Sequence, residues 1–256
     1  MKIIFFGDIV SKPGRNMVSN HIRQLKAQYQ ADICIANGEN AAAGQGIQPV
    51  IAKELFGFGV HVITTGNHAF YRKDILRFLE EDSRILRPAN FPKNVPGQGW
   101  GVYDTPAGKI GVINLLGRVY MNPCDCPFQA ADRIVSEIKE HTRVVFVDFH
   151  AEATSEKVAM ARYLNGRVSC VAGTHTHVQT ADETILDRGT AYITDVGMTG
   201  PSDGVIGIQT EIALRKFTTW IPEKYEPAQG ASMLNGIFVE VTPDTGKAIR
   251  IERIQI

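Results

Sequence analysis

The sequence has no excess of either charge, no long apolar run and no leader-like segment before its first strand. Lys and Arg number 27, and Asp and Glu also number 27, so the formal net charge is zero. A neutral chain without a basic stripe argues against long nucleic acid as its partner. No apolar run approaches the roughly 20 residues that a membrane span needs. The sequence therefore predicts a cytoplasmic protein with no membrane partner.

Paired cysteine motifs, repeats and linkers are also missing. Cys34 and Cys170 lie within apolar runs and are typical of small core residues. Cys124 and Cys126 lie in an expected loop, where two thiols alone are a weak metal signal. With no visible boundary, residues 1–256 are expected to form one domain. The G-x-G-x-x-G spacing is absent after the first strand, which argues against a Rossmann nucleotide site.

Short apolar runs alternate with amphipathic segments along the chain. The runs predict strands over 2–6, 31–37, 60–65, 143–151 and 168–177. Helical periodicity predicts helices over 11–30, 49–59, 73–82, 130–141 and 155–166. Hairpin-like strands are expected over 99–117, 190–198, 236–242 and 246–254. This mixture predicts an α/β fold in which helices cover mixed sheets. In the helix over 49–59, Val50, Ile51 and Leu55 are expected to face inward.

Five strands end in polar residues of the kinds that bind metals. These are Asp8, Glu39-Asn40, Asn67-His68, His150 and His175-x-His177. Each is common alone, and an aspartate at a strand end, such as Asp8, is more often a turn or cap residue than a metal ligand. Crossover connections, however, bring the carboxyl ends of parallel strands to one edge of a sheet. Carboxylate, amide and imidazole donors without thiolates favour manganese, iron or zinc.

Several motifs together resemble a known family. They are GDIVSKPGR, ANGENAAAGQGI, TTGNH, GRVYM, VDFHAEATSEK, AGTHTHVQTAD and TDVGMTGP. This set is similar to the YmdB-type branch of the calcineurin-like dinuclear metallophosphoesterases, over essentially the whole chain. The resemblance implies a four-layer αββα sandwich and two metal ions, iron or manganese. The sequence departs from the family shortly after GNH, where an aromatic-Asp pair is common and this chain has the run Ala69-Phe70-Tyr71-Arg72-Lys73-Asp74.

The resemblance also implies two ligand sets that share one bridging carboxylate. The first set consists of Asp8, Glu39, Asn40 and His177. The second set consists of Glu39, Asn67, His150 and His175. A hydroxide between the ions would attack phosphorus, and His68 would protonate the leaving alkoxide. The implied substrates are small phosphodiesters, 2′,3′- and 3′,5′-cyclic nucleotides in particular.

Two alternatives stay open at this point. One is a phosphomonoesterase or RNA-end-processing esterase that uses the same ligands with a different pocket. The other is a regulatory protein whose signalling does not depend on turnover. The sequence leaves open the natural substrate, the physiological metal and the pathway, and it leaves a homo-oligomer open. It also assigns no role to Arg15, Cys124, Cys126 or Asp195.

Overall fold

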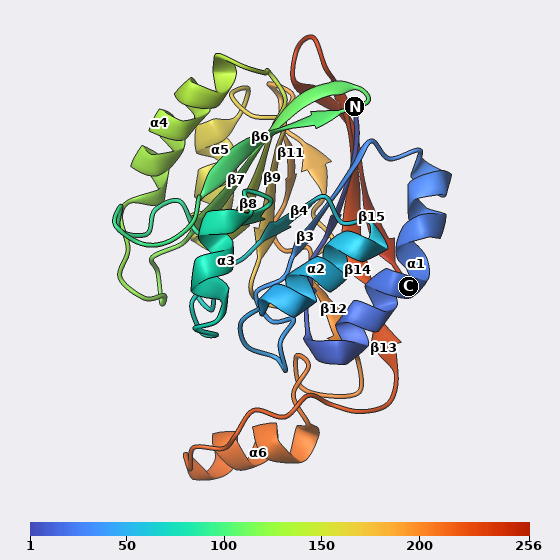
Figure 1. The fold of residues 1–256 in the computed structure, drawn as a ribbon, viewed down its shortest axis with the longest axis vertical. Helices are drawn as coiled ribbons and strands as arrows, with labels where there is room; N and C mark the ends of the chain where they lie inside the picture. Colours follow the sequence, from blue (N-terminus) through green and yellow to red (C-terminus); the bar gives the residue numbers. More distant parts are fainter.

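Two six-stranded mixed sheets lie face to face at the centre of the molecule (Figure 1). The computed structural model describes all residues, 1–256. The first sheet has the order β15 (Lys247–Gln255), β14 (Asn235–Thr242), β1 (Lys2–Phe6), β3 (Ile33–Asn37), β4 (Val62–Thr64) and β5 (Ile85–Leu86). The second has the order β10 (Thr184–Ile185), β11 (Ala191–Ile193), β9 (Cys170–Thr174), β8 (Val145–His150), β7 (Gly108–Leu116) and β6 (Trp100–Thr105). Their central strands, β1-β3-β4-β5 and β7-β8-β9-β11, are parallel.

Helices cover the outer face of each sheet. The first sheet carries α1 (Ser11–Tyr29), α2 (Pro49–Phe58) and α3 (Ile75–Glu81), and the second carries α4 (Pro127–Lys139) and α5 (Thr154–Leu164). Three apolar clusters fill the spaces between the layers: 23 residues under α1 to α3, 20 between the sheets and 18 under α4 and α5. Three apolar clusters between four layers confirm the predicted αββα sandwich. None of the helices combines the length and the apolar character needed to cross a membrane.

The first strand shows why its apolar run is continuous. In β1, Ile4 and Phe6 belong to the cluster under the helices, whereas Ile3 and Phe5 belong to the cluster between the sheets. Side chains alternate across a strand, so a strand covered on both faces needs apolar residues at every position. Phe5 meets Phe146 of β8 edge to face, with ring centroids 5.0 Å apart. This contact joins the two sheets.

The predicted elements are largely confirmed, with two corrections. Val50 was expected to face inward but is 69% exposed, because Ile51, Ala52 and Leu55 form the buried face of α2. The strand expected over 168–177 ends at Thr174. His175 and His177 therefore lie in the turn after β9, both with positive φ, at 102° and 67°. That conformation is strained for a residue other than glycine, and such strain concentrates at functional sites.

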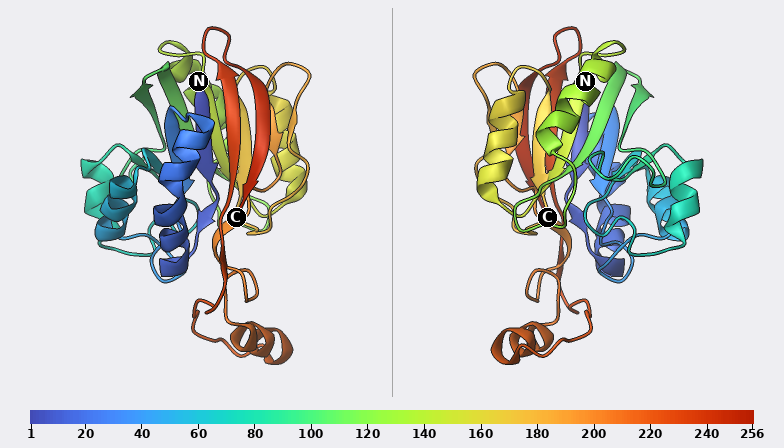
Figure 2. Two further views of the ribbon diagram at one scale, coloured as in Figure 1. Left: turned by 90° about the vertical axis from the view of Figure 1, so that its right-hand side faces the viewer. Right: turned by 90° about the vertical axis from the view of Figure 1, so that its left-hand side faces the viewer.

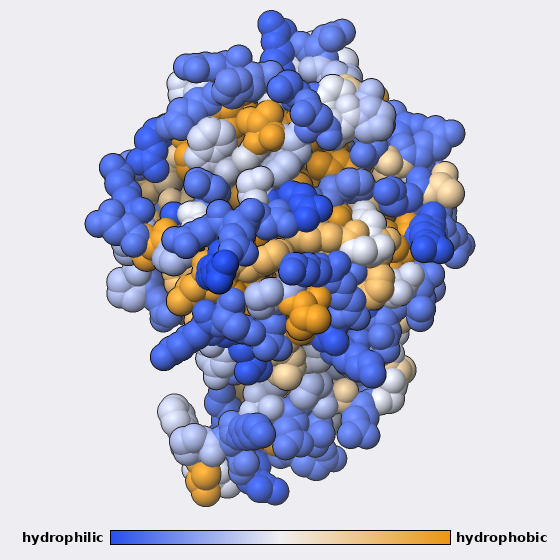
Figure 3. Space-filling view, viewed as in Figure 1, coloured by the Kyte–Doolittle hydropathy of each residue, from blue (hydrophilic) through white to orange (hydrophobic).

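A small third sheet and a projecting arm complete the chain. β12 (Met198–Pro201) pairs with both β2 (Asp8–Ile9) and β13 (Ser232–Met233). Between β12 and β13, α6 (Thr210–Thr219) projects away from the body (Figure 2). α6 was not predicted from the sequence, and only Ala213 of this helix is buried. Apolar side chains are exposed on this projection (Figure 3), among them Phe217 at 73% and Trp220 at 91%.

Candidate metal centre

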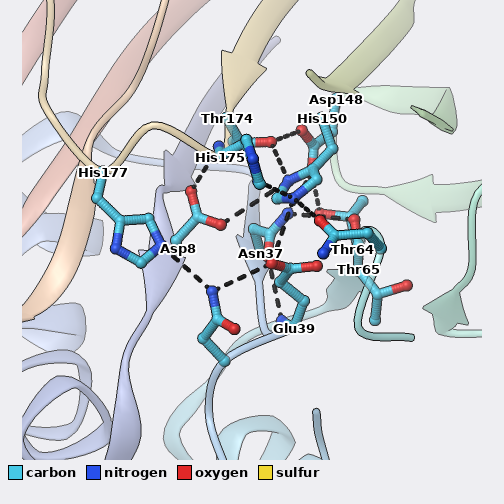
Figure 4. A network of polar contacts seen from close by, with 12 residues as sticks. Asp8, Asn37, Glu39, Thr64, Thr65, Asp148, His150, Thr174, His175 and His177 are labelled. Atoms are coloured by element: carbon cyan, nitrogen blue, oxygen red, sulfur yellow. Dashed lines mark hydrogen bonds and ion pairs between the residues drawn. The ribbon is translucent and has the colours of Figure 1, made fainter. Parts of the chain in front are cut away.

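The polar residues that end five strands meet at one end of the two sheets (Figure 4). Asp8, Glu39 and Asn67 follow strands of the first sheet, while His150, His175 and His177 end or follow strands of the second. Asp8 and His150 are fully buried, and Glu39 is 1% exposed. Buried charges of this kind are stable only when they are paired or bind a metal.

Three donor groups converge around the Nε2 atom of His150. This atom lies 3.0 Å from Asn67 Oδ1, 3.2 Å from Glu39 Oε1 and 3.0 Å from His175 Nδ1. Donor atoms held about 2.1 Å from one cation lie roughly 3.0 Å apart when their bonds are at right angles. The spacing of Glu39, Asn67, His150 and His175 therefore fits a single transition-metal ion. Glu39, His150 and His175 also form the one group of three His, Cys, Asp or Glu residues close enough to share an ion.

A second group lies on the other side of Glu39. Asn40 Nδ2 lies 3.1 Å from Glu39 Oε1 and 3.2 Å from His177 Nε2. Asp8 completes this group: its Oδ2 accepts a hydrogen bond from His175 N, whereas its buried Oδ1 has no hydrogen-bond partner and lies 3.8 Å from His150 Nδ1. A buried carboxylate oxygen without a donor is costly, and a cation would satisfy it. The amide of Asn40 would have to turn so that its oxygen faces such a cation.

The hydrogen bonds of the three histidines fix which nitrogen is free. His150 Nδ1 donates to Thr174 Oγ1, which in turn donates to Asp148 Oδ1. His177 Nδ1 donates to the Ile206 carbonyl at 2.9 Å, and His175 Nε2 lies 3.0 Å from the Glu152 carboxylate. Each ring therefore directs its other nitrogen toward the centre, as ligating histidines do.

Asp148 holds His150 in place through Thr174, a role that was not predicted from the sequence. Besides Thr174, it accepts hydrogen bonds from Thr64 Oγ1 at 2.5 Å and Asn37 Nδ2 at 3.0 Å. Burial raises the pKa of Asp148 to about 6. One signal was available: Asp148 precedes His150 by two residues in a strand, so both side chains point to the same face.

The buried ionisable groups at the centre shift one another's pKa values. Burial disfavours a charged His150, yet Glu39 and Asp8 raise its pKa to about 9. Burial and the neighbouring His150 lower the pKa of His175 to about 3. Although burial acts in the opposite sense, His150 and His68 hold the pKa of Glu39 well below its usual value. Burial raises the pKa of Asp8. A proton on His150 thus partly offsets charge that a cation would offset fully.

Gly66 leaves the space in which two of the donors meet. A Cβ atom at this position would lie 2.3 Å from His150 Cδ2 and 2.4 Å from Glu39 Oε2. Any side chain there would push these two residues apart. The glycine of the GNH motif is therefore required by the packing of the site, and the space beside it is bounded by a carboxylate and an imidazole.

A buried ion pair holds the turn that carries His175 and His177. Asp195 Oδ2 accepts hydrogen bonds from Thr176 N at 3.0 Å and from Thr176 Oγ1 at 2.7 Å. The same oxygen lies 2.6 Å from Lys157 Nζ, and both charged residues are at most 1% exposed. Asp195, unassigned from sequence, thus positions the turn. Lys157 was not predicted to take part, because a lysine in an amphipathic helix is usually solvated.

The remaining residues of interest divide between the site and the scaffold. His68 lies at the site, with Nδ1 2.9 Å from Asn40 Oδ1 and 26% of its side chain exposed. Arg15 pairs with Glu54 and donates to the Ala41 carbonyl, so it braces the loop after β3. Cys124 and Cys126 are free thiols and join no cluster of metal-binding side chains.

Comparison with known proteins gives a consistent match over the whole chain. A model of a family described as YmdB-like protein matches residues 4–254. The 2′,3′-cyclic-nucleotide 2′-phosphodiesterase of Bacillus subtilis is 46% identical over 256 residues, covering 100% of this chain and 97% of the relative. A crystal structure of a novel phosphatase from Mycoplasma pneumoniae aligns with a TM-score of 0.94 at 39% identity, covering 100% of this chain and 93% of that chain. The NAD nucleotidase of Haemophilus influenzae, with a TM-score of 0.64 at 12% identity over 100% of this chain and 55% of its own, shares the fold alone.

Proposed function

The chain belongs to the YmdB-like protein family, and from that premise we propose that it is a metal-dependent phosphoric diester hydrolase acting on small phosphodiesters. Its preferred substrates are 2′,3′-cyclic nucleotides, as the name of the Bacillus subtilis relative suggests, with 3′,5′-cyclic nucleotides as a second class. The whole chain, 1–256, acts as one metallophosphoesterase domain in the cytoplasm. The observation that carries this proposal is the convergence of Glu39, Asn67 and His175 on His150 Nε2.

Seven side chains would hold two metal ions. Glu39 would be shared by both ions, with Asp8, Asn40 and His177 available to one of them and Asn67, His150 and His175 to the other. Oxygen and nitrogen donors without thiolate favour iron or manganese. When bound, such ions neutralise phosphate oxygens and acidify water at the site. Two dications with two carboxylates leave about two positive charges, which suits an anionic substrate.

His68 donates the proton that the leaving alkoxide needs. Its Nδ1 faces Asn40, and its Nε2 makes no hydrogen bond within the protein, so Nε2 is free to reach substrate. In this role the ring acts in its protonated form: the imidazolium gives its Nε2 proton to the leaving oxygen and becomes a neutral imidazole. The proton that remains on Nδ1 faces Glu39 Oε1, 3.3 Å away.

The proposal predicts a metal requirement and a preference for diesters. Protein purified without air should contain about two iron or manganese ions per chain, measured by elemental analysis. After chelation, activity on 2′,3′-cyclic AMP should disappear, and it should return with manganese or iron. A protein that binds no transition metal after reconstitution would contradict the proposal. Faster hydrolysis of a monoester than of a diester would instead favour the phosphatase activity named for the Mycoplasma pneumoniae relative.

Substitution of His68 by alanine should slow turnover while leaving the metal content unchanged. The expected loss in kcat is about 10²-fold, at the lower end for a general acid, because the partly exposed ring allows water to substitute. The assay is 2′,3′-cyclic AMP hydrolysis, with metal counted in the same samples. His21→Ala, on α1, serves as the matched control. Loss of metal from His68→Ala would show that His68 acts as a ligand instead.

A further inference from the structure

A cavity of about 440 Å³ lies between the loop after β5 and the first turn of α4. This volume lies within the range of small-molecule sites. None of the candidate metal ligands lines it. Its walls combine cations with aromatic rings: Arg87, Lys93 and Arg133, with Phe91 and Trp100. The cavity is therefore separate from the metal centre and has a chemistry of its own.

Arg87 is a buried cation without a counterion. It is only 7% exposed, and its guanidinium donates only to the carbonyls of Pro88 at 2.8 Å and Pro96 at 3.4 Å. No neighbouring carboxylate offsets its charge, and burial lowers the pKa of this arginine. A buried charge without a partner is strongly destabilising. Nη2 donates to no protein group and is free to bind an anion.

The first turn of α4 adds positive potential to the same cavity. This helix of 13 residues begins at Pro127, has no side-chain cap and has no acidic residue in its first turn. Its free N–H groups and dipole favour an anion. Lys93 lines the cavity without an ion-pair partner, whereas Arg133 lies 3.9 Å from Glu137. The one carboxylate in the lining belongs to Asp125, which is exposed.

Aromatic side chains form the other part of the lining. Trp100 and Phe91 are both partly exposed, so each has ring surface left to contact a ligand. Phe91 also packs on Phe70, with ring centroids 5.4 Å apart, which fixes its position. Nucleobases of every kind stack on aromatic rings, which stabilises a bound nucleotide. The amides of Gln98 and Gln129, also in the lining, can hydrogen-bond to a base edge.

We propose that this cavity binds a nucleoside monophosphate. The phosphate contacts Arg87 and the first turn of α4, with Lys93 and Arg133 completing its charge neutralisation. The base contacts the aromatic surface of Trp100 and Phe91. A guanidinium matches two phosphate oxygens at once, and this favours phosphate over a single carboxylate. The inference needs neither a bound metal nor the proposed activity.

The chain offers a direct optical test, because Trp100 and Trp220 are its two tryptophans. Trp220→Phe removes the exposed tryptophan of the arm, so that the remaining fluorescence reports on the cavity. This change is combined with Glu39→Gln, which disables the candidate metal centre. Titration with adenosine 5′-monophosphate should quench Trp100 in a saturable manner. Inorganic phosphate should compete with the nucleotide without quenching, because it lacks a base.

Matched variants separate the cavity from general charge effects. Adding Lys93→Gln and Arg133→Gln should weaken nucleotide binding by about tenfold for each lost charged contact. The control pair Arg23→Gln and Arg77→Gln changes the net charge equally, on α1 and α3, and should leave binding within about twofold. Trp100→Phe with Trp220 retained should show no saturable quenching.

Three results would overturn the proposal. The first is the absence of a saturable Trp100 response to the nucleotide in the millimolar range. The second is equal quenching by adenosine without competition from phosphate, which would remove the role of Arg87. The third is an equal loss of binding in both charge-pair variants. Because the background already lacks Glu39, failure here leaves the proposed phosphodiesterase untouched, and success would not depend on it.

Discussion

Replacing Glu39 with glutamine should remove most of the bound metal and at least about 10³-fold of the hydrolytic rate. Glu39 lies between the two donor groups, 3.2 Å from His150 Nε2 and 3.1 Å from Asn40 Nδ2. A neutral amide removes one of only two carboxylates that would offset the ions. Metal ions supply several kcal/mol of transition-state stabilisation, and each 1.36 kcal/mol is about tenfold in rate. Metal content by elemental analysis and kcat/KM on 2′,3′-cyclic AMP measure the two effects.

Glu54→Gln is the matched control for this change. Glu54 is a carboxylate of α2 that pairs with Arg15, and 37% of its side chain is exposed. It should keep its metal and close to full activity. Full metal content and unchanged kcat/KM in Glu39→Gln would refute the assignment of Glu39 as the bridging ligand. Retained metal with lost activity would place Glu39 in the chemistry but outside the metal set.

Lys157→Met should lower the free energy of unfolding by about 3–5 kcal/mol, because it leaves Asp195 as a buried, unpaired charge. Lys157 Nζ and Asp195 Oδ2 lie 2.6 Å apart, with the two residues 1% and 0% exposed. Methionine keeps most of the volume of the lysine stem, so loss of the charge dominates. Urea unfolding followed by circular dichroism measures the loss. Because Asp195 also holds Thr176, metal affinity should fall by about 10–100-fold.

Two further variants isolate the ion pair. Lys53→Met, at an exposed position of α2, should change the unfolding free energy by less than about 0.5 kcal/mol. Combining Lys157→Met with Asp195→Asn should be less destabilising than the sum of the two single changes, because the double variant leaves no buried charge. Strict additivity would mean that the two residues contribute independently of each other.

The sequence was sufficient for the positions of the strands and for the residues at their ends. Apolar runs located β1, β3, β4, β8 and β9, and a continuous set of contacts joins the eight predicted site residues. This success has a physical basis: the carboxyl ends of parallel strands meet at one edge, whatever the residues between them. The αββα layering itself came from the resemblance, since periodicity alone does not say which sheet faces which.

The supporting residues could not be predicted, because their roles depend on contacts between distant segments. Asp148 accepts hydrogen bonds from Thr64 and Asn37, which belong to the other sheet. Lys157 follows ordinary helical sequence, and its partner Asp195 lies beyond β11. The packing of the two sheets brings Asp148 to Thr64 and Asn37, and the packing of α5 on the second sheet brings Lys157 to Asp195. The arm with α6 escaped prediction for the opposite reason, because it has almost no packed face.

The division of the candidate ligands between the two sheets has a thermodynamic consequence. Asp8, Glu39 and Asn67 follow strands of one sheet, and His150, His175 and His177 belong to the other. An ion held by both groups would be a reversible cross-link between the sheets. The unfolded chain has no such assembled site, so occupancy would stabilise only the folded state by mass action. The concentration of available metal would then determine the stability of the folded protein as well as its activity.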